Sequence, residues 1–268
     1  MPDSAARALI EVDAMFGRIE AFADDLITDQ IIAFGAHTRP ELALLLSMVD
    51  AGDSVFDLGG HIGSFAVPLA QKAGASGRIV VVEGLAETCA VLERNMRRLG
   101  GGASITVVNA LIAPPFSAYD ARTPTGNTGA TYFEPSTALP AAETPTTTLD
   151  ALGQAFFYPR ILKIDLEGFE EYALSGAPQL LAGRPVIYAE VAGQLLQRNG
   201  SGVDRLDAIL SANGYRYFRN IGERNAAHDR FTVVELRRLQ DGGEFFDVLA
   251  VHRDDERLSR VLNRLTEC

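Results

Sequence analysis

The sequence predicts an α/β fold built on a mostly parallel sheet, and three observations support this prediction. Short apolar runs rich in Val and Ile alternate with segments of helical periodicity, which is the pattern of successive βαβ units. A glycine-rich turn follows the first of these runs. Such a turn is typical of a strand that leads into a helix where the backbone approaches a ligand. Acidic residues end several runs, and the carboxyl ends of parallel strands meet at one edge of a sheet.

The apolar runs and the periodic segments give the elements in order. The second helix ends at three glycines, Gly100 to Gly102, which form a strong helix stop. The predicted helices are Ser64–Lys72, Ala86–Leu99, Glu170–Leu181 and Val203–Ala212. The predicted strands are Ser54–Leu58, Arg78–Glu83, Ser104–Asn109, Ile161–Asp165, Val186–Val191, Tyr215–Phe218 and Phe245–Val251.

The N-terminal segment is predicted as an amphipathic helix. Six of its apolar residues recur at three- and four-residue steps, which places them on one helical stripe. We therefore divide the chain into a helical lead-in over residues 1–50 and one domain over residues 51–268. The stripe packs either on its own domain or against a second subunit, so the sequence leaves a homodimer as an alternative. The six residues are Leu9, Val12, Phe16, Ile19, Ala23 and Leu26.

Residues 114–148 interrupt the alternation of strands and helices. They hold six prolines with many Thr, Gly and Ala residues, and so many helix breakers exclude a crossover helix. We expect an elaborated loop with one or two short strands around Gly129–Phe133. Long loops in compact domains are often functional, so this insertion is predicted to be a lid on the substrate side, with a purely structural insertion as the alternative.

Composition excludes several classes of protein. Among the 268 residues, 24 Lys and Arg stand against 35 Asp and Glu, a net charge of −11, which argues against general nucleic-acid binding. No uninterrupted apolar stretch is long enough to span a membrane. The first thirty residues lack the pattern of a secretory signal. Cys89 and Cys268 have no metal-ligand spacing, and so few cysteines fit a reducing cytoplasm.

The turn after the first strand carries the most chemical information. It reads Asp57-Leu58-Gly59-Gly60-His61-Ile62-Gly63, whereas a dinucleotide fingerprint would read G-x-G-x-x-G. A carboxylate at Asp57 would repel a pyrophosphate but suits an ammonium group. The turn therefore favours S-adenosylmethionine, which has an ammonium and a sulfonium but no diphosphate. We expect His61 to contact this cofactor through its backbone.

Two further strand ends are predicted to contact the adenosine part of the cofactor. Glu83 closes the second strand beside the glycine turn, where one carboxylate can accept both ribose hydroxyls. Asn109 ends the third strand and could hydrogen-bond the adenine edge.

More carboxylates are expected at the same edge of the sheet. Alternation in the fourth strand places Lys163 and Asp165 on one face, Glu167 follows in the loop, and Glu190 ends the next strand. Carboxylates gathered at one rim can supply a general base for an acceptor hydroxyl, or ligands for Mg²⁺ or Ca²⁺. We assign no metal ligand, because no fixed ligand spacing is visible. Lys163 could pair with one of the carboxylates.

These segments together resemble the FkbM-type methyltransferases, a branch of the class I enzymes that use S-adenosylmethionine. The resemblance covers roughly residues 29–191. It runs through VFDLGGHIG, IVVVEG, the Thr/Pro-rich insertion and above all ILKIDLEGFE. The chain departs from the family pattern at Gly60 and His61, which replace Ala and Asn, and at Gly84, which replaces Pro.

The resemblance implies a Rossmann-like sheet of seven mostly parallel strands, the last one antiparallel, with helices on both faces. It also implies methyl transfer to an oxygen of a small molecule or sugar. Asp165 would act as the base or as a metal ligand, supported by Glu167 or Glu190. The alternatives left open are a Mg²⁺- or Ca²⁺-dependent methyltransferase acting on a diol, an NAD-linked oxidoreductase, which the turn disfavours, and a non-catalytic subunit that binds the cofactor. The residues expected at the cofactor are Asp57, Gly59, Gly60, His61, Gly63, Glu83, Asn109 and Asp165.

Overall fold

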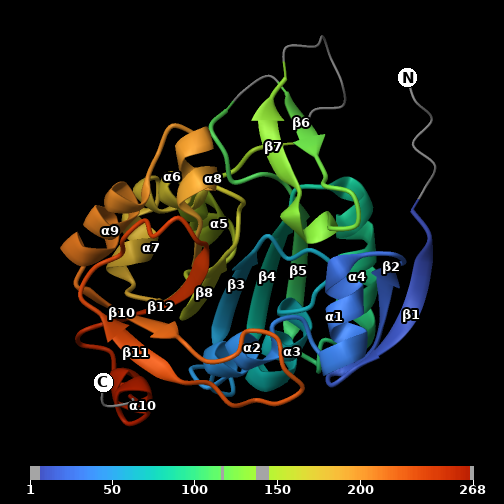
Figure 1. The fold of residues 1–268 in the computed structure, drawn as a ribbon, viewed down its shortest axis with the longest axis horizontal. Helices are drawn as coiled ribbons and strands as arrows, with labels where there is room; N and C mark the ends of the chain where they lie inside the picture. The colour runs from blue at the N-terminus through green and yellow to red at the C-terminus, as the bar shows by residue number, and fades with distance from the viewer. Residues whose placement is uncertain (1–6, 116–117, 137–144, 266–268) are drawn as a thin grey trace.

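The protein is built around one eight-stranded sheet, seen in a computed structural model that describes residues 7–115, 118–136 and 145–265. The strand order is β11-β10-β12-β9-β8-β3-β4-β5 (Figure 1). The five strands β9, β8, β3, β4 and β5 run parallel. The bounds are β3 Ser54–Leu58, β4 Arg78–Glu83, β5 Ser104–Asn109, β8 Ile161–Ile164, β9 Val186–Val191, β10 Tyr215–Asn220, β11 Val233–Leu236 and β12 Phe246–His252.

All seven predicted strands are present, and the last strand in the chain is antiparallel as expected. β12 lies between β9 and β10 and runs antiparallel to both. The predicted strand count of seven is wrong, because β11 adds an eighth strand antiparallel to β10. β11 is a four-residue edge strand, and so short and half-exposed a segment leaves no clear alternating pattern in the sequence.

Helices cover both faces of the sheet, as predicted (Figure 1). On one face α2, α3, α4 and α10 bury side chains such as Leu45, Leu69 and Leu92 against the strands. On the other face α5 to α9 do the same, for example through Leu180 and Leu206. The bounds are α2 Arg39–Leu46, α3 Ala66–Ala73, α4 Ala86–Leu99, α5 Leu149–Ala155, α6 Glu170–Ser175, α7 Pro178–Ala182, α8 Gly193–Arg198, α9 Val203–Ala212 and α10 Leu258–Leu262.

The single helix predicted over Glu170–Leu181 is wrong. Two short helices, α6 and α7, occupy this stretch. Pro178 begins the second one, and because proline disfavours helical backbone in the residue before it, one helix could not continue through Ala177.

The helix predicted over the first apolar stripe is also wrong. Residues 9–22 form an antiparallel hairpin of β1 (Leu9–Ala14) and β2 (Gly17–Phe22), and the helix α1 (Leu26–Phe34) begins only afterwards. Ile19 and Ala21 are fully buried at two-residue spacing, which is a strand pattern. It was missed because other apolar residues of this segment recur at three- and four-residue steps. Gly17 has φ +124° at the turn, where a Cβ would lie 2.8 Å from Leu99 Cδ2. The homodimer prediction thus loses the helix on which it was based.

The insertion forms a small separate hairpin over the carboxyl ends of the parallel strands. β6 (Tyr119–Arg122) pairs antiparallel with β7 (Tyr132–Pro135), and a 3-10 turn, η1 (Thr128–Ala130), lies between them. The extra strands expected near Gly129–Phe133 are therefore present, although part of the predicted 114–148 insertion, residues 116–117 and 137–144, lies outside the described residues.

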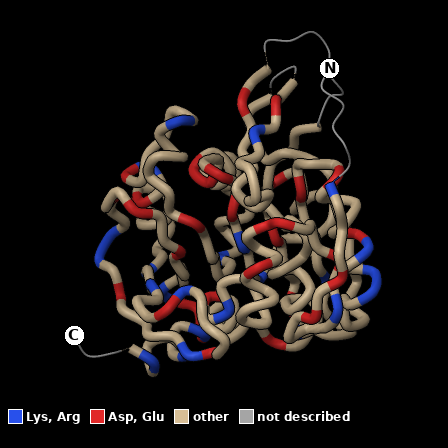
Figure 2. Tube along the Cα trace, turned by 45° about the vertical axis from the view of Figure 1, so that its right-hand side comes forward, with Lys and Arg blue, Asp and Glu red and all other residues tan. Residues whose placement is uncertain are grey.

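Charged residues occur along the whole described chain. Acidic and basic residues are interspersed along the trace (Figure 2). In the described part of the chain, no helix combines the length and the apolar character that crossing a bilayer requires.

Candidate active site

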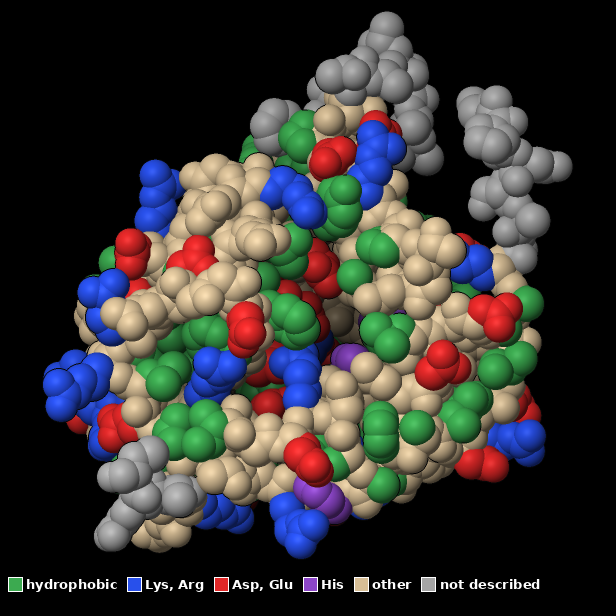
Figure 3. Space-filling model, viewed as in Figure 1, with side chains coloured by type: hydrophobic (Ala, Val, Ile, Leu, Met, Phe, Trp, Pro, Cys, Tyr) green, Lys and Arg blue, Asp and Glu red, His purple; other side chains and the backbone are tan. Residues whose placement is uncertain are grey.

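A cavity of about 1030 Å³ opens at the carboxyl ends of the parallel strands. Its walls come from α1, the glycine turn, the ends of β4, β8 and β9, the insertion, α8 and residues 224–245. In the space-filling view this face is hollowed at its centre, with acidic side chains in the hollow and a histidine beside it (Figure 3). Ligand pockets usually measure about 300–1,000 Å³, so the cavity has room for a cofactor and an acceptor together.

Neighbouring residues pack closely against the glycine turn, and one of its glycines also lines the cavity. Gly59 has φ +76°, and a Cβ there would lie 1.9 Å from the Asp165 carbonyl oxygen. A Cβ on Gly60 would lie 2.1 Å from Val81 Cγ1, and one on Gly63 would lie 3.2 Å from Leu92. Gly59 lines the cavity, whereas Gly60 and Gly63 are not among its lining residues. Gly60 and Gly63 therefore have a packing role, and the cofactor contact predicted for them stays a prediction.

Asp57 is buried and is not among the residues that line the cavity. Its side chain is fully buried, and Lys163 Nζ lies 3.2 Å from its Oδ1 and 3.5 Å from Asp165 Oδ2. Burial lowers the pKa of Lys163, but the two carboxylates raise it more, so the ammonium stays charged. The pairing predicted for Lys163 is confirmed. Asp57 thus already holds a buried cation, and the direct contact predicted between Asp57 and a cofactor ammonium stays a prediction.

Glu83 lines the cavity and holds the glycine turn in place. Its Oε2 accepts a hydrogen bond of 2.9 Å from the His61 backbone N–H, and its Oε1 accepts one of 2.8 Å from Leu85. Each carboxylate oxygen keeps a lone pair for another donor. Asn109 instead donates to the carbonyls of Glu83 and Gly84 and lies outside the cavity lining. The adenine contact predicted for Asn109 stays a prediction, and residues 110–112 line the wall there.

A buried chain of hydrogen bonds joins the turn to two distant segments. The His61 ring Nε2 lies 2.7 Å from Thr128 Oγ1, whose hydroxyl donates over 2.7 Å to Asp25 Oδ2. Because a hydroxyl has one proton, Thr128 must accept from His61, which places the ring proton on Nε2. Burial lowers the pKa of His61 to about 4, so the ring is neutral and Nδ1 is an acceptor. That Nδ1 is buried without a partner.

Sequence reasoning missed Asp25 and Thr128. A partial signal was available for Asp25, which precedes an apolar stretch and is the N-cap of α1, where its Oδ1 accepts from the Ile27 backbone N–H. Nothing near Thr128 indicates that it contacts residues 25 and 61.

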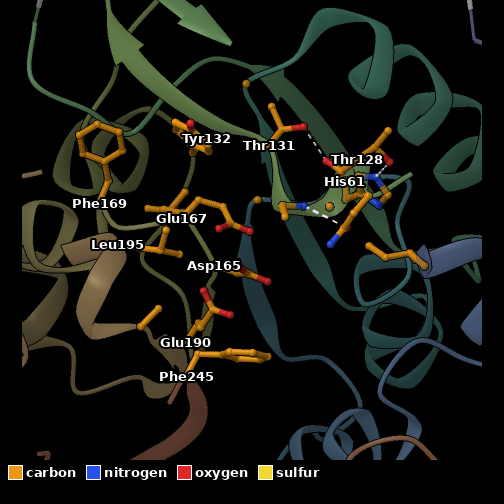
Figure 4. Close-up of a pocket in the computed structure, with 18 of the residues that line it drawn as sticks. His61, Thr128, Thr131, Tyr132, Asp165, Glu167, Phe169, Glu190, Leu195 and Phe245 are labelled. Atoms are coloured by element: carbon orange, nitrogen blue, oxygen red, sulfur yellow. Dashed lines mark hydrogen bonds between the residues drawn. The ribbon is translucent and has the colours of Figure 1, made fainter. Parts of the chain in front are cut away.

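Asp165, Glu167 and Glu190 converge on one point of the cavity wall, and we call them the acidic cluster (Figure 4). One carboxylate oxygen of each lies within 4.8 Å of the others. Burial and the charges of Asp165 and Glu170 raise the pKa of Glu167 to about 9. Burial and neighbouring carboxylates also raise the pKa of Glu190. The structure brings these three predicted residues together as expected.

The loop that carries Asp165 and Glu167 is fixed by a further carboxylate. Glu170 is buried and accepts hydrogen bonds from the backbone N–H groups of Leu166 and Gly168. Glu167 itself has φ +51°, an uncommon conformation for a residue with a side chain. The hydrogen bonds to Glu170 hold this tight loop in place, and both carboxylates face the cavity as a result.

Aromatic residues that sequence reasoning missed surround the acidic cluster. Tyr132, Phe169 and Phe245 lie around it in Figure 4. The guanidinium of Arg198 stacks 3.9 Å from the centre of the Tyr132 ring. These side chains come from the insertion, the loop before α6, the segment before β12 and α8. Because they are scattered along the sequence, only the fold shows that they form one wall.

The residues present fit the cofactor expected from the sequence. Gly59 lets the ligand approach the backbone, Glu83 offers free lone pairs at the end of β4, and His61 Nδ1 is a buried acceptor without a donor. Asp165 and the rest of the acidic cluster give a negative wall suited to a cationic sulfonium ligand.

Comparisons with known proteins give the family of the chain. A family model, the methyltransferase FkbM domain, matches residues 57–217, more than half of the chain. No curated protein sequence matches at a significant level. The chain is similar to a solved structure of M. jannaschii TYW2 in complex with AdoMet, at 11% identity and a TM-score of 0.46, covering 93% of this chain and 88% of that one.

Two further solved structures are similar at low identity. One is an O-methyltransferase from Bacillus cereus in complex with SAH, at 13% identity and a TM-score of 0.46, covering 86% of this chain and 84% of that one. The other is precorrin-6y C5,15-methyltransferase from Geobacter metallireducens, at 14% identity and 0.43, covering 78% and 87%. The family match rests on the segment that contains the glycine turn, Glu83 and the acidic cluster, and the chain therefore belongs to the FkbM family of S-adenosylmethionine-dependent methyltransferases.

Proposed function

We propose that the protein transfers a methyl group to a hydroxyl oxygen of a small molecule or sugar. The observation that carries this proposal is the acidic cluster, because three carboxylates face the cofactor cavity beside an aromatic wall. Carboxylates accept hydrogen bonds from hydroxyl groups and can take up their protons. Aromatic rings such as Tyr132 and Phe245 offer apolar faces to the carbon skeleton of the acceptor.

In this reaction the chain positions the acceptor and removes its proton. Bound S-adenosylmethionine supplies a methyl group whose bond to sulfur breaks, with its electron pair left on sulfur, as the new O–CH₃ bond forms. Asp165 accepts the hydroxyl proton during transfer, since alcohols are far too weakly acidic to ionise beforehand. Lys163 holds the Asp165 carboxylate through the 3.5 Å ion pair. Glu83 and the glycine turn hold the cofactor's ribose end.

Loss of the base tests this assignment. Asp165→Asn keeps the shape of the side chain but cannot accept the proton, so we expect the methyl-transfer rate to fall about 10²–10⁴-fold. Binding of S-adenosylhomocysteine, measured by calorimetry, should change little. Turnover is measured as transfer of labelled methyl groups to a panel of sugars and hydroxylated small molecules, with Glu256→Gln, an exposed carboxylate, as the control.

Two results would contradict the proposal. Labelled methyl recovered only on nitrogen or carbon acceptors would exclude hydroxyl transfer. A turnover of Asp165→Asn equal to that of Glu256→Gln would remove Asp165 from the chemistry.

A further inference from the structure

We propose that the acidic cluster binds one divalent hard cation, which would hold the oxygens of the acceptor. This inference rests on the proposed function and deepens it by naming a ligand of the same site. The cluster consists of Asp165 and Glu167 in the loop after β8 and Glu190 near the end of β9.

The spacing of the three carboxylates suits a single ion. Oxygens bound to one Ca²⁺ lie about 2.3–2.6 Å from it, so two of them are at most about 5 Å apart. One oxygen from each carboxylate of the cluster lies within 4.8 Å of the others. Small side-chain rotations would therefore bring all three oxygens onto one ion, and carboxylate oxygens are the ligands that Ca²⁺ and Mg²⁺ prefer.

A second observation points to a missing positive partner. Oε2 of Glu190 is shielded from solvent and meets no hydrogen-bond donor, although a buried carboxylate oxygen normally has one. Among the described residues, Lys163 is the one cation within ion-pair distance of the cluster, and it contacts only Asp165 while also serving Asp57. No cation that the structure describes lies within ion-pair distance of Glu167 or Glu190, and the charges of Arg198 and Arg224 act on them only from farther away.

The surroundings hold the cluster ready for an ion. β9 is central in the sheet, between β8 and β12, and Glu170 fixes the loop on the other side through the N–H groups of Leu166 and Gly168. Three protein oxygens leave about three positions of a six-coordinate ion open. Because all three residues of the cluster line the cavity, the acceptor class that fits such an ion is one with two adjacent oxygens, such as a vicinal diol.

The test uses Mn²⁺ as the probe. The full chain is freed of metal with EDTA, dialysed, and titrated with Mn²⁺ with and without S-adenosylhomocysteine, while free Mn²⁺ is measured by electron paramagnetic resonance. We expect one Mn²⁺ bound per chain, and at least tenfold weaker binding for Glu167→Gln and for Glu190→Gln. Glu256→Gln, which alters an exposed carboxylate outside both the cluster and the cavity lining, should bind Mn²⁺ as the unchanged protein does. Circular dichroism confirms that each variant is folded.

The outcomes separate this inference from the proposed function. No Mn²⁺ binding up to several millimolar, or unchanged binding in both cluster variants, would overturn the cation site. If hydroxyl methylation nevertheless proceeds in EDTA, the proposed function stands without the ion. If Mn²⁺ binds but no hydroxyl acceptor is ever methylated, the ion site stands and the proposed function fails.

Discussion

At the scale of single residues, the buried pair of Asp57 and Lys163 is structural support for the site. Both side chains lie in the interior, on neighbouring strands β3 and β8, whose register places them directly opposite each other. Lys163 also donates to the Gly59 carbonyl over 3.1 Å, so the pair ties the start of the glycine turn to the strand that carries Asp165. Its contribution is to the shape of the cavity floor.

Removing Asp57 should therefore destabilise the protein. Asp57→Ala leaves the Lys163 charge buried and short of a partner, and breaking a buried pair in this way costs about 3–5 kcal/mol. The free energy of unfolding is measured by urea titration. Asp13→Ala removes a carboxylate that is 90% exposed, and should cost less than about 1 kcal/mol. A stable Asp57→Ala protein that no longer binds S-adenosylhomocysteine would instead show that Asp57 contacts the cofactor.

The sequence was most informative about residues whose position follows from a strand. Glu83, Lys163, Asp165 and Glu190 were predicted at one edge because each occupies or closely follows the end of a buried parallel strand. Asp25 and Thr128 could not be found in this way. They lie 103 positions apart, and their contact depends on where the insertion docks, which no local pattern encodes.

At the scale of elements, the insertion is attached to the domain through η1. Thr128 in η1 donates to Asp25 at the start of α1, and accepts from His61 in the glycine turn. Three elements therefore meet in one buried chain of hydrogen bonds at the cavity wall. Prolines and glycines correctly indicated that residues 114–148 are not a helix. They did not indicate that the segment would dock on α1, because α1 follows the β1–β2 hairpin, which the sequence pattern did not predict.

Thr128→Val tests this attachment. Valine has the shape of threonine but no hydroxyl, so it leaves His61 Nε2–H and one oxygen of Asp25 with fewer partners. We expect a loss of about 1–3 kcal/mol in unfolding free energy and weaker calorimetric binding of S-adenosylhomocysteine. The matched control is Thr123→Val in the same insertion, where the hydroxyl pairs only with Thr131. Equal effects of the two substitutions would mean that the buried chain has no special role.

At the scale of the whole molecule, a buried carboxyl group joins distant parts of the fold. Glu41 of α2 accepts hydrogen bonds from Tyr188 on β9 and Asn220 on β10. Burial and the charge of Asp247 raise the pKa of Glu41 to about 7, although the two hydrogen bonds oppose this shift. The folded state therefore keeps a proton that the unfolded chain releases near its ordinary pKa.

Stability should consequently fall as the pH rises from about 4.5 to about 7. In this window the unfolded state binds fewer protons than the folded state at Glu41, so the free energy of unfolding decreases with pH. One such group contributes a slope of at most about 1.4 kcal/mol per pH unit. Urea unfolding of Glu41→Gln from pH 5 to pH 8 should show a shallower decline than that of the unchanged protein. Glu256→Gln, which alters an exposed side chain, should match the unchanged protein, and a Glu41→Gln curve parallel to it would refute the assignment.

The position of β12 inside the sheet has a consequence for synthesis. This strand is the last in the chain, yet it lies between β9 and β10. During translation β9 and β10 therefore emerge from the ribosome before β12, the strand that lies between them. Until residue 252 has left the exit tunnel, the two edges lack their partner and one wall of the cavity is incomplete. The nascent chain can acquire a finished methyltransferase site only after β12 has emerged.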